Sequence, residues 1–307
     1  MRLCATLFAL LLVAPTLQAD ELLLNQRALL QDDARLPREA ALDRLQQVRF
    51  AFREAAAEAD EVPLWARTYA QYGSWDGGLQ RDGEGLLLGM DRALGGQWVG
   101  GGLLGVTRTR LEQDGDHRRE HSQYLGLYAA TRVYYQLGFK LGFIHGWHHP
   151  ERGSARSQQV FGESSFALDF RDFTLEPFAG LALQRLDAGN VREPGLRLPG
   201  ADEEAGYLSL GWRLSAPWYV GSRKWVGRAS LALRQNLGDD SLCSRALNGL
   251  GEPVTACSRA FERTGLRLDL GLDHELGRDL YLGLSYVGQF ADDARDNTLA
   301  ARLSLKY

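Results

Sequence analysis

The sequence is poor in the features that mark several common classes of protein. Its 307 residues include three cysteines, nine prolines and two methionines, and its formal net charge is −4. Binding to nucleic acid usually requires a marked excess of positive charge. We therefore expect no nucleic-acid partner, and the charge balance indicates no other class of partner.

Long hydrophobic runs are also missing after Ala19. A helix that spans a bilayer needs roughly 20 consecutive apolar residues. In lipid, only helices and closed barrels satisfy every hydrogen-bonding group of the backbone. If the protein lies in a membrane, it must therefore cross it with a closed β-sheet.

The N-terminus has the pattern of a secretory signal. Arg2 provides a charged start, and residues 3–13 form an apolar run that is too short for a membrane-spanning anchor. We expect residues 1–19 to be a signal peptide that is cleaved after Ala19. The mature protein would then be exported.

Two cysteines stay in the exported chain. Cys4 leaves with the signal, whereas Cys243 and Cys257 enter an oxidising compartment. An even number of cysteines there favours one disulfide bridge over two free thiols. Such a bridge would restrain the loop between them and be worth about 3 kcal/mol in the loop-entropy model.

Residues 20–62 have the period of a helix and form a short N-terminal segment. Pro37 suits a helix start, and apolar residues between Leu42 and Phe52 recur at spacings of three and four, with arginine and glutamate on the other face. We expect an amphipathic helix over residues 38–59. A weaker apolar cluster at residues 22–30 indicates a second helix before it.

From residue 64 the period changes to two, which is typical of strands with one apolar and one polar face. Leu266 and Leu268, for example, alternate with Arg267 and Asp269. We expect strands at 64–75, 84–94, 97–110, 120–131, 134–147, 157–170, 174–186, 203–214, 224–237, 259–274, 280–291 and 297–307.

A soluble sandwich and a membrane barrel both use such strands. A sandwich buries its leucine faces between two sheets, whereas a membrane barrel turns them to lipid and keeps the charged faces in its lumen. Long polar connections alternate with short ones, as in outer-membrane barrels. The long ones are expected at 76–83, 111–119, 148–156, 187–202 and 238–258. We therefore predict an all-β domain over residues 63–307, a twelve-stranded antiparallel transmembrane β-barrel, with the helix in its lumen or in the periplasm.

The end of the chain favours a closed sheet. A long apolar final strand would be an exposed edge, unless it pairs with the first strand. Leu303, Leu305 and the terminal Tyr307 resemble the C-terminal signal that the barrel-assembly machinery reads in bacterial outer-membrane proteins. We expect this machinery, periplasmic chaperones and outer-membrane lipid or lipopolysaccharide as partners.

Several stretches of the barrel region match one known family in their order and spacing. They are PLWARTYAQYG, GLLLGMDRALGGQWVGGGLLG, YLGLYAA, LGFKLGFIHGWHHPERG, LEPFAGLALQRL, VREPGLRL, YLSLGWRL and the final strand. With them, residues 63–307 resemble the translocator barrel of autotransporters, the type V secretion proteins.

The resemblance implies a barrel in the outer membrane of a Gram-negative bacterium, with a helix in its lumen that links the barrel to a passenger. In this sequence residues 20–37 are all that would lie outside the helix after signal cleavage, so we expect little or no passenger. We expect a monomer that forms a helix-plugged pore. A porin-like channel is an alternative.

Strand parity separates the charged residues that face the lumen from those that face outward. The predicted lumen-facing residues are Asp91, Lys140, Asp169, Glu176, Arg213, Arg228, Arg234, Arg267, Asp269, Asp273, Arg302 and Lys306. Because both signs of charge intermix, we interpret the set as a network that braces the barrel and holds the helix. An aqueous pore with ion selectivity is the alternative.

The segment HGWHHPERGS contains the residues best suited to chemistry. His145, His148, His149 and Glu151 are of types that bind metals, but their spacing matches no closed zinc site. Ser154 or Ser157 near His149 could provide a nucleophile and a base, although no G-x-S-x-G motif is present. We expect no enzyme, no catalytic or metal site and no cofactor, with an outer-membrane barrel hydrolase acting on lipid or peptide as an alternative.

The run GGQWVGGGLLG is rich in glycine but is not followed by the Lys-Ser or Lys-Thr of a phosphate-binding loop. Glycines inside a strand more often permit close packing. We expect them to make room for aromatic side chains or for the helix.

Overall fold

The computed structural model describes residues 22–54, 63–95, 97–133, 136–193, 196–238, 243–247, 253–258, 264–277 and 280–305. The predicted signal peptide, Lys306, Tyr307 and the part of the predicted helix beyond Glu54 lie outside the described residues.

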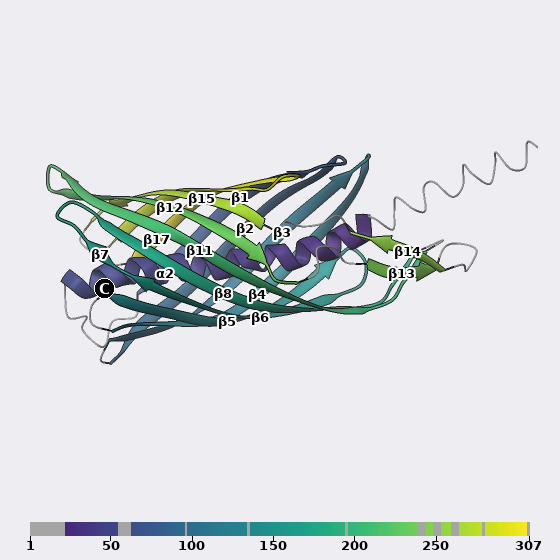
Figure 1. Cartoon of the computed structure of the whole chain (residues 1–307), viewed down its shortest axis with the longest axis horizontal. Helices are drawn as coiled ribbons and strands as arrows, with labels where there is room; N and C mark the ends of the chain where they lie inside the picture. The colour runs from purple at the N-terminus through teal and green to yellow at the C-terminus, as the bar shows by residue number, and fades with distance from the viewer. Residues whose placement is uncertain are drawn as a thin grey trace, which may run out of the picture.

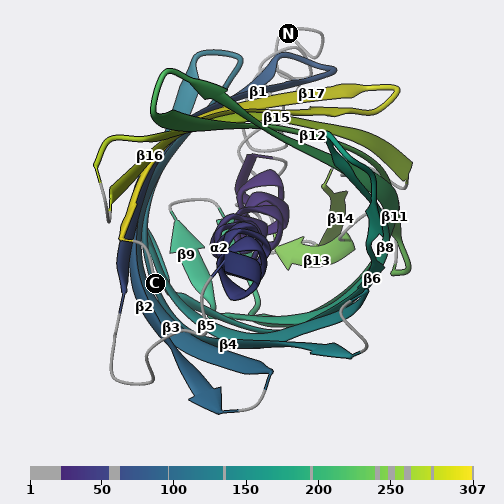
Figure 2. The same cartoon turned by 90° about the vertical axis from the view of Figure 1, so that its left-hand side faces the viewer.

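Twelve long antiparallel strands form one closed sheet (Figures 1 and 2). They are β1 (Leu64–Trp75), β2 (Leu79–Gly95), β3 (Trp98–Gln113), β4 (Asp116–Val133), β5 (Leu137–Pro150), β6 (Ala155–Phe166), β8 (Thr174–Ala188), β11 (Ala201–Val220), β12 (Arg223–Asn236), β15 (Thr264–Glu275), β16 (Leu280–Phe290) and β17 (Ala294–Leu305). Each pairs with its neighbours in chain order, and the ring closes where β1 pairs with β17, with Tyr69 opposite Ala300. The last strand is therefore no edge, and the predicted twelve-stranded barrel is confirmed.

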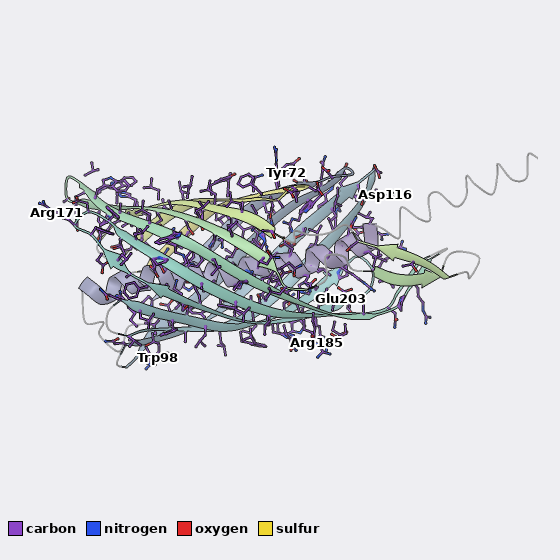
Figure 3. All side chains as sticks on the ribbon, viewed as in Figure 1. Tyr72, Trp98, Asp116, Arg171, Arg185 and Glu203 are labelled. Carbon is purple, nitrogen blue, oxygen red and sulfur yellow. The ribbon has the colours of Figure 1, made fainter. Side chains whose placement is uncertain are left out.

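The outer wall of the barrel is apolar. Leu104, Leu127 and Leu299 are 60%, 65% and 63% exposed. Aromatic side chains lie nearer the two ends: Figure 3 shows Trp98 toward one end and Tyr72 toward the other, and both are exposed. A soluble sandwich would bury these leucines, so that alternative is wrong. An apolar band with aromatic residues at both borders fits a lipid bilayer.

The strands run further than predicted, and this shortens several connections. β2 begins at Leu79 and β3 extends to Gln113, so the loops predicted at 76–83 and 111–119 are the tight turns 76–78 and 114–115. Backbone pairing continues beyond the lipid-facing band, where the outward residues become polar and the sequence resembles a loop. The connections at 189–200 and 237–263 are long, as predicted.

A helical segment runs along the barrel axis (Figure 2). Residues 22–33 are helical, residue 34 forms a turn, and α2 continues over Arg35–Glu54. The helix therefore lies in the lumen and not in the periplasm, and the weaker helix predicted before Pro37 is present. Among the described helices, none combines the length and the apolar character needed to cross a bilayer.

A small second sheet lies at the mouth where the helical segment begins (Figure 1). The two long connections supply its strands, which are in order β14 (Pro253–Cys257), β13 (Cys243–Leu247), β10 (Leu196–Leu198) and β9 (Val191–Glu193). Leu23 and Leu24 of the helix pack against Val191 and Leu198. We call β9, β10, β13 and β14 the cap sheet, because it holds the start of the helix at this mouth.

Candidate functional site: the helix-filled lumen

One face of the helix packs on aromatic side chains that point into the barrel. Ala40, Ala41 and Leu45 share a buried cluster with Trp65 and Tyr128. Its other members are Leu36, Tyr69, Leu87, Val99, Leu103, Tyr124, Ile144, Phe161, Ala182, Tyr207 and Ala300. Burying a large apolar side chain contributes about 1.5–3 kcal/mol, so this lining gives the leucine-rich stripe of the helix a place in an otherwise polar lumen.

Glycines on neighbouring strands make room for these aromatic rings. Gly89 lies opposite Trp65, and Gly101 lies opposite Tyr128. A Cβ atom at Gly89 would lie 2.3 Å from Trp65 Cε2, and one at Gly101 would lie 2.7 Å from Tyr128 Cε2. A side chain at Gly89 would displace the Trp65 ring, and one at Gly101 would clash with the Tyr128 ring and with the Met90 carbonyl oxygen at 2.4 Å. Both observations agree with the close-packing interpretation of the glycine run.

Arg81 of β2 binds the acidic residues near the break in the helix. Its Nη1 donates to Asp32 Oδ2 at 3.1 Å and to Asp33 Oδ1 at 2.6 Å. Its Nη2 donates to Asp296 of β17 at 2.6 Å, and Arg35 of α2 pairs with the same carboxylate. Because Arg81 is fully buried, these bonds join β2, β17 and the helix in one enclosed network.

Asp43 of α2 is the centre of a second network. Arg67 Nη1 lies 3.0 Å from Asp43 Oδ2, and Arg228 Nη1 lies 3.3 Å from Asp43 Oδ1. Arg302 Nη1 approaches Asp43 Oδ2 at 3.6 Å. Arg228 and Arg302 also share Asp273, at 2.8 and 2.6 Å. Arginines from β1, β12 and β17 thus converge on one carboxylate of the helix.

At Arg44 of α2 the helix supplies the positive charge and the barrel wall supplies the carboxylate. Its Nε and Nη2 donate to the two carboxylate oxygens of Asp91 at 2.7 and 2.9 Å, the bidentate geometry in which arginine binds carboxylates most strongly. Tyr128 Oη donates to Asp91 Oδ2 at 3.1 Å, and Trp65 Nε1 donates to Tyr128 Oη at 2.7 Å. This ion pair is therefore connected to the aromatic lining.

Gln46 of α2 joins the helix to the opposite wall. It accepts a hydrogen bond from Lys140 Nζ at 2.7 Å and donates one to Glu176 Oε2 at 2.7 Å. Lys140 also donates to Glu163 Oε1 at 2.8 Å, and Arg213 Nη1 donates to the same oxygen at 2.6 Å. The predicted residues Lys140, Glu176 and Arg213 therefore lie in one network against the helix.

Further predicted lumen residues contact the helix from β12 and β15. Arg234 Nη1 donates to Asp32 Oδ1 at 3.2 Å. Arg267 Nη2 lies 3.3 Å from Glu39 Oε2 and 3.3 Å from Asp269 Oδ2. A cavity of about 90 Å³, lined by both polar and apolar side chains, adjoins them between α2 and β8, β11 and β12.

Asp169 does not line the lumen. Its side chain is exposed in the two-residue strand β7 (Leu168–Asp169), at the turn before β8, where it accepts a hydrogen bond from Thr174 Oγ1 at 2.8 Å. The prediction assumes one strand over 157–170, in which inward and outward side chains alternate as far as Asp169. Because β6 ends at Phe166, this alternation does not reach Asp169.

Some residues that hold the helix were not predicted. Arg81 and Asp296 fell in segments interpreted as connections, although they belong to β2 and β17. Arg67 and Glu163 lie within predicted strands at inward positions. Applying the parity rule to every charged residue of those strands would have found Arg67 and Glu163.

The histidine segment is divided between the two faces of β5. His148 points inward and is 1% exposed, whereas His145 and His149 lie on the outward face. These side chains therefore do not converge on one point. Within the part of the chain that the structure describes, no group of three or more His, Cys, Asp or Glu residues is placed to hold a metal ion.

His148 is the centre of a buried hydrogen-bond relay. Its Nε2 lies 2.8 Å from Ser157 Oγ, and its Nδ1 lies 2.8 Å from Ser122 Oγ. Ser122 Oγ donates to Glu120, whose Oε1 is 3.4 Å from His148 Nδ1. A serine, a histidine and an acid in this order are the parts of a nucleophile, base and orienting group. The sequence had suggested His149 as the base, but His149 points away from Ser157.

The two cysteines lie opposite each other in the cap sheet, Cys243 on β13 and Cys257 on β14. Directly opposed residues of antiparallel strands have Cα atoms about 4.5–5.5 Å apart, a separation that disulfides also adopt. The backbone is thus compatible with the bridge, which stays a prediction.

Leu303 and Leu305 of the predicted assembly signal face outward.

Comparison with known proteins decides the family. A family model described as the autotransporter β-domain matches residues 64–287. The chain belongs to the autotransporter family. Two curated relatives, each an extracellular serine protease of Serratia marcescens, are 27% and 26% identical over 311 and 310 residues. Each match covers 90% of this chain and 29% of the relative, so this autotransporter chain corresponds to less than a third of their length.

Solved autotransporter barrels have the same fold. The translocator domain of NalP from Neisseria meningitidis has a TM-score of 0.68 at 15% identity, covering 92% of this chain and 99% of that domain. The β-domain of BrkA from Bordetella has a TM-score of 0.64 at 21% identity, covering 81% of this chain and 100% of the other. This autotransporter is therefore a translocator barrel of the Gram-negative outer membrane, with its N-terminal helix inside the barrel. Translocator domains are in general not enzymes.

Proposed function

We propose that this autotransporter barrel works as a helix-plugged translocator that presents the segment before residue 22 at the mouth closed by the cap sheet. Long connections of outer-membrane barrels face the outside, and the helix begins at the mouth that has the connections 189–200 and 237–263. In this orientation the N-terminal segment leaves the barrel on the cell surface.

The observation that supports the plug most directly is the convergence of Arg67, Arg228 and Arg302 on Asp43. Buried charges are costly unless they are paired. A barrel that worked as an open channel would leave these arginines without the carboxylate of the helix. The same reasoning disfavours a porin-like channel.

We further propose that the protein reaches the outer membrane as a monomer after removal of residues 1–19, with the help of periplasmic chaperones and the barrel-assembly machinery. An epitope tag placed after Ala19 tests the orientation. It should be accessible to antibody on intact cells, whereas a tag in the opposite turn at Gly221 should be accessible only after the outer membrane is opened. Accessibility of the Gly221 tag alone on intact cells would contradict the orientation.

Conductance tests the plug. The full chain in planar bilayers should conduct weakly, and a variant without residues 20–60 should conduct several times more if its band on unheated gels shows that it is folded. An equally low conductance of the folded deletion variant would contradict the plug.

A hydrolase is the second candidate function, because the Glu120, Ser122, His148 and Ser157 relay has suitable geometry. We propose instead that the relay braces the lumen beside the helix. Ser157 is 3% exposed, and on the same strand Gln159 donates to the carbonyl oxygen of Ala34, so the helix covers this wall. A fluorophosphonate probe should leave Ser157 unlabelled in the full chain and in the helix-deleted barrel, and labelling that disappears in His148→Gln would favour the hydrolase.

A further inference from the structure

The outward face of the barrel carries a compact group of basic side chains at its cap-sheet end. They are Arg108 and Arg110 of β3, Arg119 and His121 of β4, and His149 of β5, and all are exposed. We call them the basic stripe. The strand register places Arg110 opposite Arg119, Arg108 opposite His121, and His121 opposite His149. The stripe is therefore continuous across three neighbouring strands.

Such an arrangement has an electrostatic cost in the absence of an anion. Like charges directly opposite each other on a sheet are destabilising, and Arg110 and Arg119 form such a pair. Glu112 Oε2 lies 3.4 Å from Arg110 Nη2, and Glu84 Oε1 lies 4.0 Å from Arg108 Nη1. Both contacts are highly exposed, and exposed pairs of this kind contribute little. Arg119 has no carboxylate within ion-pair distance among the described residues.

The stripe directly borders the lipid-facing wall. On β3 the outward residues that precede Arg108 are Leu104 and Val106, which are 60% and 54% exposed. On β5 the exposed Phe143 and Trp147 precede His149. Residues on the same face of a strand are about 7 Å apart, so the change from apolar to basic takes place within one such step. A ligand that fits this wall has acyl chains against the apolar residues and anionic groups against the basic stripe, nearer the cap sheet.

The basic character ends directly at β2 on one side, whereas on the other side the adjacent strand β6 adds the exposed Arg156 before an acidic residue follows on β8. Asp82 and Glu84 of β2 lie opposite Arg110 and Arg108. On the other side Asp187 of β8 lies opposite Arg156 of β6. The basic character is therefore confined to one sector of the barrel. A general attraction to anionic membranes would instead require basic residues around the whole rim.

From this placement we propose that the basic stripe binds the phosphate groups of a phosphorylated glycolipid, the lipopolysaccharide of the outer leaflet. Arginine forms bidentate bonds with phosphate, and a headgroup with more than one phosphate matches the pairs Arg110 with Arg119 and Arg108 with His121. The proposal rests on the orientation given above, with the cap sheet outside, because that orientation puts the stripe beside the outer leaflet.

Native mass spectrometry of the purified full chain in detergent tests the site. The chain is titrated with lipid A, with dephosphorylated lipid A and with phosphatidylglycerol. The double variant Arg110→Gln/Arg119→Gln should bind lipid A about tenfold more weakly, the factor expected for the loss of a charge-assisted hydrogen bond. Arg295→Gln is the matched control, because it removes an exposed arginine from β17 outside the stripe, and it should bind as the unchanged protein does.

Binding must also depend on the phosphate groups. Dephosphorylated lipid A should bind at least about tenfold more weakly than lipid A, and phosphatidylglycerol should bind weakly to all variants. Equal binding of lipid A by the double variant and the unchanged protein would overturn the proposal, as would equal binding of the dephosphorylated form or of phosphatidylglycerol. If the double variant gives no folded band, the single variant Arg119→Gln replaces it. This variant should also bind lipid A more weakly than the unchanged protein. Because the assay needs no secretion, its failure is distinguishable from failure of the translocator proposal.

Discussion

Arg44 of the helix and Asp91 of β2 form a bidentate ion pair inside the barrel, with donor–acceptor distances of 2.7 and 2.9 Å. Asp91 is 1% exposed, so this pair is shielded from solvent. The helix is thus bound to the wall by directed, charged contacts in addition to the apolar packing of Ala40, Ala41 and Leu45.

Replacing Asp91 should weaken the folded barrel. Asp91→Ala removes the carboxylate that neutralises the buried Arg44, and breaking a buried pair in this way costs about 3–5 kcal/mol. Denaturant unfolding followed by tryptophan fluorescence should show the loss. In the double variant Arg44→Met/Asp91→Leu no charge is left, and much of the stability should return. Equal losses in the single and double variants would contradict this account.

Asp43→Asn should loosen the plug. The substitution leaves Arg67, Arg228 and Arg302 facing a neutral amide, so the helix loses attraction to β1, β12 and β17. Single-barrel conductance should rise relative to the unchanged protein, while the control Asp43→Glu, which keeps the charge, should change it little. Identical traces for all three proteins would show that Asp43 does not hold the helix in place.

Gly89→Ala should impair the aromatic lining of the lumen. The added Cβ would lie 2.3 Å from Trp65 Cε2, and overpacking of this kind costs about 1–3 kcal/mol. Gly162→Ala is the matched control, since the nearest atom to a Cβ there is the Lys140 carbonyl oxygen at 3.7 Å. The midpoint of thermal unfolding on semi-native gels should fall for Gly89→Ala, and a similar fall for both variants would refute the steric explanation.

Cys243 and Cys257 should be joined in the exported protein. Cleavage by a protease between the two positions should leave the fragments linked until a reductant is added, and the intact chain should be lighter by two hydrogens than its reduced form. Cys243→Ser/Cys257→Ser provides the control in which the fragments separate at once. Alkylation of both thiols in the unreduced, unfolded protein would rule the bridge out.

The alternation of side chains along each strand is what made the barrel predictable. Leucine at every second residue of β15, and leucine or alanine at every second residue near the end of β17, assigns one face to lipid. The charged residues between them, such as Arg267 and Arg302, then face inward. The same rule could not fix where strands end. Beyond the bilayer both faces become polar, so the sequence predicts connections at Arg81 and Asp296, although both residues anchor the helix.

Contacts between elements were less accessible to sequence reasoning than the elements themselves. Parity predicts that Lys140 and Glu176 face the lumen, but not that Gln46 bridges them. The lumenal position of the helix depended on whether its leucine stripe finds apolar partners, and these come from Trp65, Tyr69 and other aromatics of separate strands. His148 and His149 illustrate the limit most clearly, because a shift of one residue decides which histidine meets Ser157.

The seam between β1 and β17 also constrains the order of assembly. The carboxylate of Asp296 on β17 and the guanidinium of Arg81 on β2 meet the helix from opposite sides of that seam. A ring already joined at the seam would admit the helix only lengthwise, past successive layers of unmatched charge. Placing the helix while β1 and β17 are still apart avoids that barrier. We therefore expect the helix to enter the lumen before these two strands pair, and their pairing to be a late step in the maturation of the barrel.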